Sequence, residues 1–275
     1  MMLVNGEVRE EISAQDRGLH FGDGVFETVA VDTARALCLD RHIRRLGEGC
    51  RRLAIAPPAA ATLEEECARI CDGVERGVLK IMVTRGVGGR GYAPGEGASP
   101  TRIVARYPWP AYPASARSRG VAVRVCGTRL GRNARLAGIK HLNRLEQVLA
   151  RSEEDASGCA EGIMLDEDGR VIEGVMSNVF MRHGRVLTTP DLSACGVAGI
   201  MRELVLESAA TLEGIEPRVG AMSVDELSSA DECFLTNSLI GIWPINRLQG
   251  QAIEIGPLAH TLQSLLVESG AMTRD

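Results

Sequence analysis

Three closely spaced prolines divide this chain and constrain its fold more than any other feature. Pro108, Pro110 and Pro113 lie in the run Tyr-Pro-Trp-Pro-Ala-Tyr-Pro-Ala-Ser over residues 107–115. Proline has no amide donor and clashes with a preceding helical turn, so neither a helix nor a central strand passes readily through such a run. We therefore expect residues 109–118 to link a small N-terminal α/β domain (1–108) to a larger C-terminal domain (119–275).

Composition and charge exclude several classes of protein. Of the 275 residues, 45% are hydrophobic and 24% are charged, which suits a globular protein with a sizeable core. The net charge is −5 and no long basic run occurs, so we expect neither nucleic acid nor an anionic membrane surface as a partner. The chain lacks a stretch of about 18 apolar residues and a signal-peptide pattern, so we expect no membrane span and no export.

The cysteines indicate reduced thiols. None of the 8 cysteines forms a Cys-x-x-Cys pair. Cys67 and Cys71 are spaced to share a helix face, but no second pair or nearby histidine completes a zinc site. We expect a cytoplasmic protein that binds no metal.

Hairpin and helix patterns alternate irregularly along the chain. Turn residues at 166–169 and 183–184, each between short apolar runs, predict β-hairpins. Apolar spacing predicts helices over residues 41–53, 62–75, 143–156, 200–212 and 258–269. Asp40, Thr62 and Asn143 are suited to cap the first three of these helices. Hairpins mixed with separate helices favour an α+β (mixed α/β) fold over a regular strand–helix–strand series.

Lys140 is the residue with the greatest chemical interest. It lies among apolar residues in Leu136-Ala-Gly-Ile-Lys140-His-Leu-Asn143, just before a predicted helix. Partial burial of a lysine favours the neutral, nucleophilic amine, which a carbonyl cofactor needs in order to form a Schiff base. Most lysines at a loop–helix junction are simply exposed to solvent, so Lys140 alone does not decide between the two interpretations.

Three other features are ambiguous when each is taken alone. Glu173 at a strand end needs a partner if it is buried, but is ordinary if it is exposed. Arg45 either binds an anion or belongs to a solvated helix face. The Gly196-Val-Ala-Gly199 turn enters a helix whose first N–H groups could bind phosphate, although most such glycines only form turns. The glycine-rich run 85–92 matches neither a P-loop nor a dinucleotide fingerprint.

The joint order of these features is more informative than any one of them. It is carried by five segments: His20-Phe-Gly-Asp-Gly-Val-Phe-Glu27, His42-Ile-Arg-Arg-Leu46, Gly138-Ile-Lys-His-Leu-Asn143, Glu173-Gly-Val-Met-Ser-Asn-Val-Phe180 and Gly196-Val-Ala-Gly-Ile200. This order resembles the class IV pyridoxal-phosphate family, which includes branched-chain and D-amino-acid aminotransferases and aminodeoxychorismate lyases. The resemblance covers nearly the whole chain. It implies a fold-type IV enzyme of two domains with pyridoxal 5'-phosphate at their interface.

The resemblance also implies roles for these residues. Lys140 corresponds to the Schiff-base lysine, and Glu173 to the carboxylate that keeps the pyridine nitrogen protonated. Arg45 corresponds to the arginine that pairs with the cofactor phosphate. The backbone N–H groups of Ile200 and Met201 correspond to the rest of the phosphate site.

Further positions are assigned less directly. Ser238 matches another phosphate contact of the family. Arg90, Tyr92 and Arg144 are candidate contacts for substrate carboxylates, chosen by location and charge. The family also implies a homodimer.

Two stretches bear on the reaction. Residues 129–151 and 85–92 most resemble the lyase branch, and Asn143-Arg144 stands where aminotransferases usually have a tyrosine. The resemblance implies a lyase of folate biosynthesis that converts 4-amino-4-deoxychorismate to 4-aminobenzoate and pyruvate, with Lys140 as general base. An aminotransferase on the same scaffold and a non-catalytic protein of the same fold are the alternatives.

Overall fold

Two compact units make up the computed structural model, which describes residues 1–95, 97–153 and 158–274. The first unit comprises Met1–Pro110 and Ile139–Asn143, and the second comprises Ala111–Gly138 and Arg144–Asp275. The chain thus leaves the first unit between Pro110 and Ala111, inside the segment expected to be a linker.

Lys140 belongs to the first unit, which corrects the expectation that the C-terminal domain carries it. The cause is a short antiparallel pairing with a strand near the N-terminus. The Phe26 N–H donates to the Lys140 carbonyl (2.9 Å), and the Leu142 N–H donates to the Gly24 carbonyl (3.0 Å). Backbone hydrogen bonds of this kind depend on strand pairing, which local sequence does not reveal.

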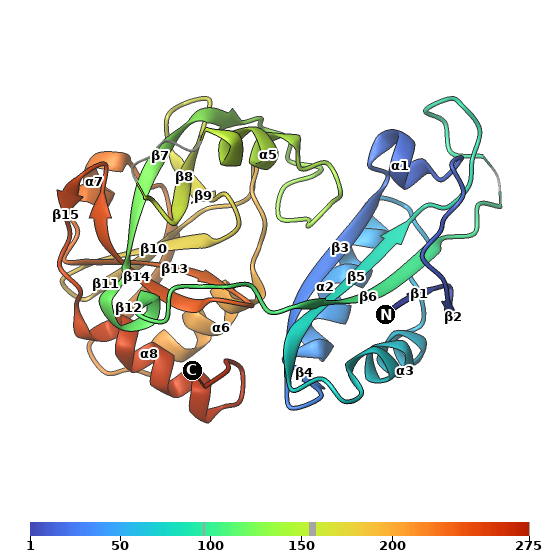
Figure 1. The fold of residues 1–275 in the computed structure, drawn as a ribbon. Helices are drawn as coiled ribbons and strands as arrows, with labels where there is room; N and C mark the ends of the chain where they lie inside the picture. The colour runs from blue at the N-terminus through green and yellow to red at the C-terminus, as the bar shows by residue number, and fades with distance from the viewer. Residues whose placement is uncertain (96, 154–157, 275) are drawn as a thin grey trace. The chain divides into compact units, whose positions relative to one another are not determined.

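The first unit contains an antiparallel sheet, whose strands in the described residues follow the order β2-β1-β6-β5-β3-β4 (Figure 1). Its strands are β1 (Met2–Val4), β2 (Glu7–Val8), β3 (Gly24–Asp32), β4 (Arg35–Ala36), β5 (Arg76–Thr84) and β6 (Thr101–Pro108). Its helices are α1 (Arg17–Phe21), α2 (Leu39–Arg52) and α3 (Ala60–Cys71).

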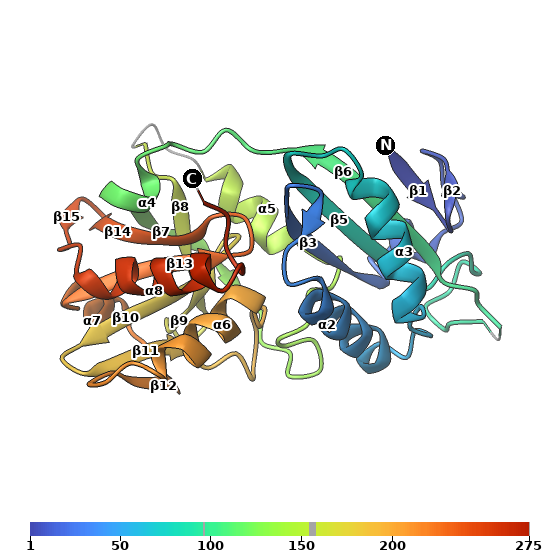
Figure 2. The same ribbon diagram turned by 90° about the horizontal axis from the view of Figure 1, so that it is seen from below.

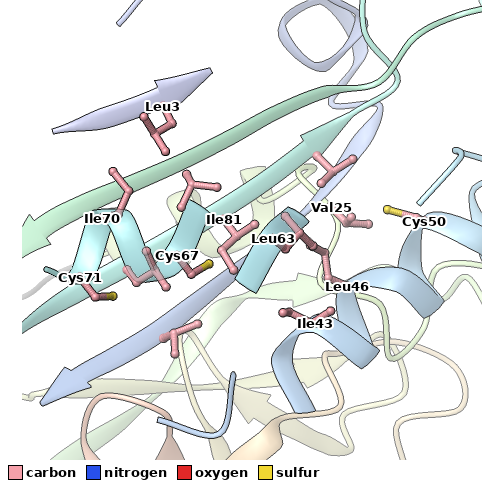
Figure 3. Close-up of a cluster of buried hydrophobic side chains, with 14 of the residues drawn as sticks. Leu3, Val25, Ile43, Leu46, Cys50, Leu63, Cys67, Ile70, Cys71 and Ile81 are labelled. Carbon is pink, nitrogen blue, oxygen red and sulfur yellow. The ribbon is translucent and has the colours of Figure 1, made fainter. Parts of the chain in front are cut away.

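Helices α2 and α3 cover one face of this sheet and enclose the core of the unit (Figure 2). Figure 3 shows side chains of both helices directed toward the sheet, including Ile43, Leu46, Leu63 and Ile70. On β3 the core positions alternate as Val25, Val29 and Val31, as a strand with one buried face requires. Glu27 falls in the same alternation, so its carboxylate points to the core side of β3.

Both helices begin earlier than predicted. Helix α2 starts at Leu39 after Cys38, which has a left-handed φ of 52°, so Asp40 is not its N-cap. Helix α3 starts at Ala60, so Thr62 lies within its first turn and forms no capping box. The N-cap residue of neither helix forms a side-chain hydrogen bond. Burial of an apolar face supplies most of the stability of such a helix, so the helix can form without this cap.

The third predicted cap is also wrong. Helix α5 (Leu145–Ser152) begins two residues after Asn143, whose side-chain amide donates to the Gly22 carbonyl (3.0 Å). Asn143 is thereby held in the first unit and is not available to cap the helix. The predicted end of this helix at 154–156 lies outside the described residues.

The second unit is built on a larger, mixed sheet. Its strands follow the order β12-β11-β10-β13-β14-β7-β8-β9, and β15 pairs with β14. The pairs β11–β12, β14–β7 and β7–β8 are parallel and the others are antiparallel. The strands are β7 (Val121–Leu130), β8 (Glu161–Asp166), β9 (Val171–Gly174), β10 (Asn178–His183), β11 (Val186–Pro190), β12 (Glu216–Gly220), β13 (Glu232–Asn237), β14 (Gly241–Leu248) and β15 (Gln251–Ala252).

Helices surround this sheet. They are α4 (Ala116–Arg119), α5, α6 (Ile200–Ala209), α7 (Val224–Ser228) and α8 (Pro257–Glu268), and α6 packs beside α8 (Figure 2). The α+β (mixed α/β) class predicted from the sequence is confirmed. Across the ranges that the structure describes, no helix is both long and apolar enough to cross a membrane.

Candidate active site

Lys140 is fixed to β3 through its backbone and its side chain. His141 forms an antiparallel bridge with Val25, which extends β3 by a short extra segment. The half-buried ammonium of Lys140 lies 4.4 Å from the centroid of the Phe26 ring, at a distance that allows a cation–π interaction. The amine is therefore held beside a defined aromatic surface.

Lysine is scarce in this chain, and its two lysines are Lys80 and Lys140. Lys80 lies on β5, opposite Thr28 of β3, and its Nζ is 5.4 Å from the same Phe26 ring. Both lysine side chains thus gather at one residue of the sheet, while the other basic residues are arginines and histidines. This composition is visible in the sequence and makes any covalent chemistry at a lysine simple to assign.

Arg45 is held by a carboxylate of β3. Its Nε donates to Glu27 Oε1 (2.7 Å) and its Nη2 donates to Glu27 Oε2 (2.5 Å), which is a bidentate pair. His42, one helical turn earlier on α2, contacts Glu27 Oε2 through Nδ1 (2.6 Å). The Glu27 side chain is 1% exposed and that of Arg45 is 15% exposed, so the guanidinium lies at the margin of the core.

Glu27 is ionised despite its burial. Burial alone raises the pKa of this carboxyl, but the electrostatic attraction and hydrogen bonds of Arg45 and His42 outweigh that effect and bring the pKa to about 2. The attraction between Glu27 and Arg45 thus persists throughout the neutral range.

Arg17 anchors the glycine-rich loop that carries two of the predicted substrate contacts. Its Nη1 donates to the Gly91 carbonyl (2.7 Å), and its Nη2 donates to the Tyr92 carbonyl (2.8 Å). Its Nε donates to Asp23 Oδ2 (2.9 Å). An added Cβ on Gly88 would lie 2.6 Å from Arg17 Cδ, so the loop passes close to this side chain.

The predicted contacts on this loop point outward. Tyr92 is 87% exposed, although its ring lies 5.4 Å from that of Phe21, and Arg90 is exposed as well. The structure therefore shows how the loop is held from beneath, with the two side chains accessible.

We expect Arg17→Ala to release this loop. The variant loses two charge-assisted hydrogen bonds to loop carbonyls, each of which contributes about 1.5–3 kcal/mol. Trypsin cleavage after the exposed Arg90 should therefore accelerate by roughly tenfold or more. Arg9→Ala, which removes an exposed pair with Glu7, serves as the control. Equal cleavage rates in the two variants would contradict the anchoring role.

Glu173 is the central carboxylate of the second unit. It lies on β9 opposite Met164 of β8 and is 4% exposed. Its Oε2 accepts a hydrogen bond from the Val197 N–H (2.8 Å), and its Oε1 accepts one from Gln147 Nε2 (3.4 Å). The predicted strand-end carboxylate is thus buried and oriented by two donors.

The turn over residues 196–199, whose Val197 N–H binds Glu173, leads into α6. Gly138 pairs with Val197 of this turn, and the Gly138 N–H donates to the Gly196 carbonyl (2.9 Å). Gly199 is the N-cap of α6, and Ile200 and Met201 are its first two residues. The N–H groups of a first helical turn have no partner within the helix, which makes them suitable for an anion.

Small residues are required at this turn. An added Cβ on Gly199 would lie 2.1 Å from Asn178 Oδ1, while Asn178 Nδ2 donates to the Val197 carbonyl (2.9 Å). Gly196 has a left-handed φ of 85°. A side chain at either glycine would displace the start of α6.

Strand β13 ends near this turn, because Thr236 pairs with Asn178 of β10. Thr236 is 1% exposed, and its hydroxyl has no hydrogen-bond partner among the described residues. Two residues later, Ser238 is half-buried. A buried hydroxyl without a partner is uncommon and is typical of a position that meets a bound group.

Arg144 lies near Glu173 in the second unit. Burial lowers the pKa of this guanidinium, and the negative charges of Glu173 and Glu146 oppose that effect. Arg144 still carries a full charge at neutral pH, because an arginine pKa starts far above that range. A half-buried cation near Glu173 is suited to a carboxylate ligand.

The predicted residues thus form two groups. The first unit brings Lys140 and Arg45 to neighbouring residues of β3, namely Phe26 and Glu27. The second unit brings together Glu173, Arg144, Ile200, Met201 and Ser238 around the 196–199 turn and the end of β13. Among the side chains that the structure describes, no cluster of three or more His, Cys, Asp or Glu is placed to bind a metal.

The prediction from sequence missed Glu27, Gln147 and Thr236. Glu27 was detectable, because a carboxylate inside the apolar alternation of a strand requires a buried partner. Gln147 and Thr236 had no such pattern around them. Their proximity to Glu173 and Asn178 depends on packing between distant segments.

Comparison with known proteins defines the class. The family model "Amino-transferase class IV" matches residues 24–248. The chain is 34% identical to the aminodeoxychorismate lyase of Vibrio harveyi, over 97% of this chain and 99% of that one. The chain therefore belongs to the class IV aminotransferase family, as the sequence predicted.

Solved structures add detail within this family. The structure of 4-amino-4-deoxychorismate lyase from Pseudomonas aeruginosa has a TM-score of 0.94 and 47% identity, covering 99% of this chain and 100% of that one. The branched-chain amino acid aminotransferase of Escherichia coli has a TM-score of 0.89 and 26% identity, covering 100% of this chain and 96% of that one. The fold is that of fold-type IV enzymes, and pyridoxal 5'-phosphate is the cofactor of the family, in which another branched-chain aminotransferase was solved with pyridoxamine 5'-phosphate.

The residues described above fit this cofactor. In the first unit, Lys140 offers an amine for the aldehyde and Arg45 a guanidinium for the phosphate. In the second unit, the buried Glu173 carboxylate suits the ring nitrogen, and the first N–H groups of α6 suit a phosphate. The buried Thr236 hydroxyl, which has no hydrogen-bond partner among the described residues, also indicates a position that meets a bound group.

Proposed function

We propose that this chain is a lyase that converts 4-amino-4-deoxychorismate to 4-aminobenzoate and pyruvate in folate biosynthesis. The observation that carries the proposal is the 47% identity to the Pseudomonas aeruginosa lyase over essentially both chains, against 26% to the Escherichia coli aminotransferase. The Asn143-Arg144 pair after Lys140 supports it. The Asn143 side chain is hydrogen-bonded to Gly22, and Arg144 provides a half-buried cation that suits a substrate with carboxylates.

In this proposal, Lys140 would bond covalently to the aldehyde of pyridoxal 5'-phosphate, and Arg45 would contact its phosphate. The Ile200 and Met201 N–H groups and Ser238 complete the phosphate contacts. Glu173 accepts a hydrogen bond from the protonated ring nitrogen, and its own orientation is set by the Val197 N–H.

Bound pyridoxal phosphate supplies an aldehyde that captures amines and a ring that accepts electrons. Lys140, which would hold the aldehyde, would also act as general base and remove the proton from the amine-bearing ring carbon of the substrate. The carbon–oxygen bond between the ring and the enolpyruvyl group breaks. The methylene of that group gains a proton, the group leaves as pyruvate, and the remaining ring becomes aromatic. Aromatisation drives the reaction, so the main tasks of the protein are to position groups and to move this proton.

Arg90, Tyr92 and Arg144 are the proposed contacts for the substrate carboxylates. Arg90 and Tyr92 lie on the loop that Arg17 anchors, and Arg144 lies near Glu173. Guanidinium groups bind carboxylates through paired hydrogen bonds, so two arginines suit a substrate with two carboxylates.

We further propose a homodimer in the cytoplasm. Cys50 and Cys67 are buried thiols outside any disulfide, which suits a reducing compartment. Burial raises the pKa of Cys67 to about 12 and that of Cys50 to about 11, which leaves both thiols protonated. Sedimentation of the active enzyme should give twice the chain mass. A stable, fully active monomer would contradict the dimer.

One experiment separates the lyase from the aminotransferase alternative. The purified chain with pyridoxal phosphate is mixed with enzymatically made 4-amino-4-deoxychorismate, and 4-aminobenzoate and pyruvate are measured together. We expect equal amounts of both products. In parallel, D-alanine or leucine with 2-oxoglutarate should give glutamate far more slowly. Faster glutamate formation than 4-aminobenzoate formation would favour the aminotransferase.

A further inference from the structure

The pair between Glu27 and Arg45 is unusual for its place in the first unit. Glu27 occupies a core-facing position of β3, in line with Val25 and Val29, which belong to the buried apolar cluster of this unit. Figure 3 shows Val25 in that cluster together with Ile43 and Leu46 of α2. An apolar residue at position 27 would face the same cluster. Replacing a buried ion pair by apolar residues is often neutral or stabilising, so stability alone is a weak reason for this carboxylate.

The geometry fixes the guanidinium plane of Arg45. Both oxygens of Glu27 are used, Oε1 by Nε and Oε2 by Nη2, and His42 Nδ1 also contacts Oε2. His42 and Glu27 are each 1% exposed, so neither can turn away without leaving a buried charge or ring nitrogen unsatisfied. The exposed fraction of Arg45 is larger, at 15%. The inner edge of the guanidinium is thus held by Glu27, and the side chain reaches solvent from there.

Resting on the proposed binding of the cofactor phosphate by Arg45, we infer that Glu27 is the positioning residue that presents Arg45 to that phosphate, with His42 holding Glu27 in place.

Two opposing effects follow from this arrangement. The negative charge of Glu27 reduces the net charge that a phosphate meets, which weakens the attraction. Preorganisation acts in the other direction, because a free arginine loses the freedom of several rotatable bonds when it binds an anion. Glu27 removes that freedom before the cofactor arrives. The inference requires that orientation outweighs the loss of charge.

The test compares two cofactors that differ only in the phosphate. The full chain is freed of cofactor and titrated with pyridoxal 5'-phosphate and with pyridoxal, using the absorbance change at Lys140. In Glu27→Gln, Arg45 keeps a neutral neighbour but loses the ionic bidentate pair. We expect the preference for pyridoxal 5'-phosphate over pyridoxal to fall roughly 10- to 100-fold, as for carboxylates that orient metal ligands. Glu27→Asp, which keeps the charge but withdraws it by one methylene, should reduce the preference in the same direction.

A matched control exists in the same unit. Glu66 on α3 forms an equivalent bidentate pair with Arg102 of β6, with both contacts at 2.6 Å and the Glu66 side chain 5% exposed. Glu66→Gln should lower the melting temperature as Glu27→Gln does, yet leave the preference between the two cofactors unchanged. A purely structural role for Glu27 predicts the same behaviour for both variants.

Arg45→Gln separates failure of this inference from failure of the assignment on which it rests. If Arg45→Gln reduces the preference but neither Glu27 variant does, Glu27 is not a positioning residue and Arg45 is still the phosphate ligand. If Arg45→Gln leaves the preference unchanged, Arg45 does not bind the phosphate and the inference falls with it. Tighter binding of pyridoxal 5'-phosphate by Glu27→Gln would also overturn the inference, because charge would then outweigh orientation. If Glu27→Gln does not fold, Glu27→Asp decides by the same ratio.

Discussion

Lys140→Ala is expected to abolish both the covalent attachment of the cofactor and the formation of 4-aminobenzoate. The amine of Lys140 is held beside Phe26 by backbone pairing with β3, and the other lysine of the chain, Lys80, lies farther from that ring. Loss of a general base costs about 10²–10⁴-fold in rate, and loss of the nucleophile adds to that cost. The visible absorbance of the bound cofactor should disappear with the activity.

Lys80→Ala is the matched control for this experiment. The Nζ of Lys80 lies 5.4 Å from the centroid of the Phe26 ring, against 4.4 Å for Lys140. Lys80→Ala therefore removes a lysine near the same ring that has no proposed role in the chemistry. Borohydride reduction followed by peptide mapping should place the cofactor on the peptide that contains Lys140, since the chain has one other lysine. Label on Lys80, or more than a tenth of normal turnover in Lys140→Ala, would remove the assignment.

The family of the chain could be anticipated from the neighbours of Lys140, but the place of Lys140 in the fold could not. The residues around it resemble one family, and the family match confirms that membership. Its position in the first unit depends on hydrogen bonds to Gly24 and Phe26. Those partners lie more than a hundred residues earlier, and no periodicity within residues 136–143 indicates which strand edge the segment joins.

Strands with a strong local pattern were predicted well, and pairings between distant strands were not. The hairpin between β8 and β9 followed from the turn at 166–169 and from apolar runs on either side. The parallel neighbours of β7 are β14 and β8, which come from separate parts of the sequence. The edge strand β12 contains Pro217 and mostly exposed residues, so it lacks the apolar alternation that marks a buried strand.

The candidate site residues were proposed from the resemblance to one family. Arg45 and Glu173 are each ambiguous when taken alone, and only their joint order with Lys140 and the Gly196–Gly199 turn suggested them as ligands. What the sequence could not specify is which groups hold them. Glu27 holds Arg45 from another element, and Val197 holds Glu173 from a turn more than twenty residues later. Such contacts follow from packing rather than from local composition.

Glu173→Gln provides the second large expected effect. The carboxamide has nearly the same shape and can still accept the Val197 N–H, so the turn before α6 should keep its position. It carries no negative charge, however, and so cannot stabilise a proton on the ring nitrogen of the cofactor. Loss of one such preorganised electrostatic contact costs about 10²–10³-fold in turnover. We expect the covalent attachment to Lys140 to survive, with turnover reduced by that factor.

Cofactor occupancy is measured together with turnover for each variant, which distinguishes this effect from misfolding. Asp168→Asn makes the same chemical change in the same unit, at an exposed hairpin turn where Asp168 pairs with Arg132 and Arg170. It should retain full occupancy and full turnover, because exposed ion pairs contribute little. If Glu173→Gln kept turnover within tenfold of the parent at full occupancy, charge at the ring nitrogen would not be required. The acid–base chemistry would then have to depend on Lys140 alone.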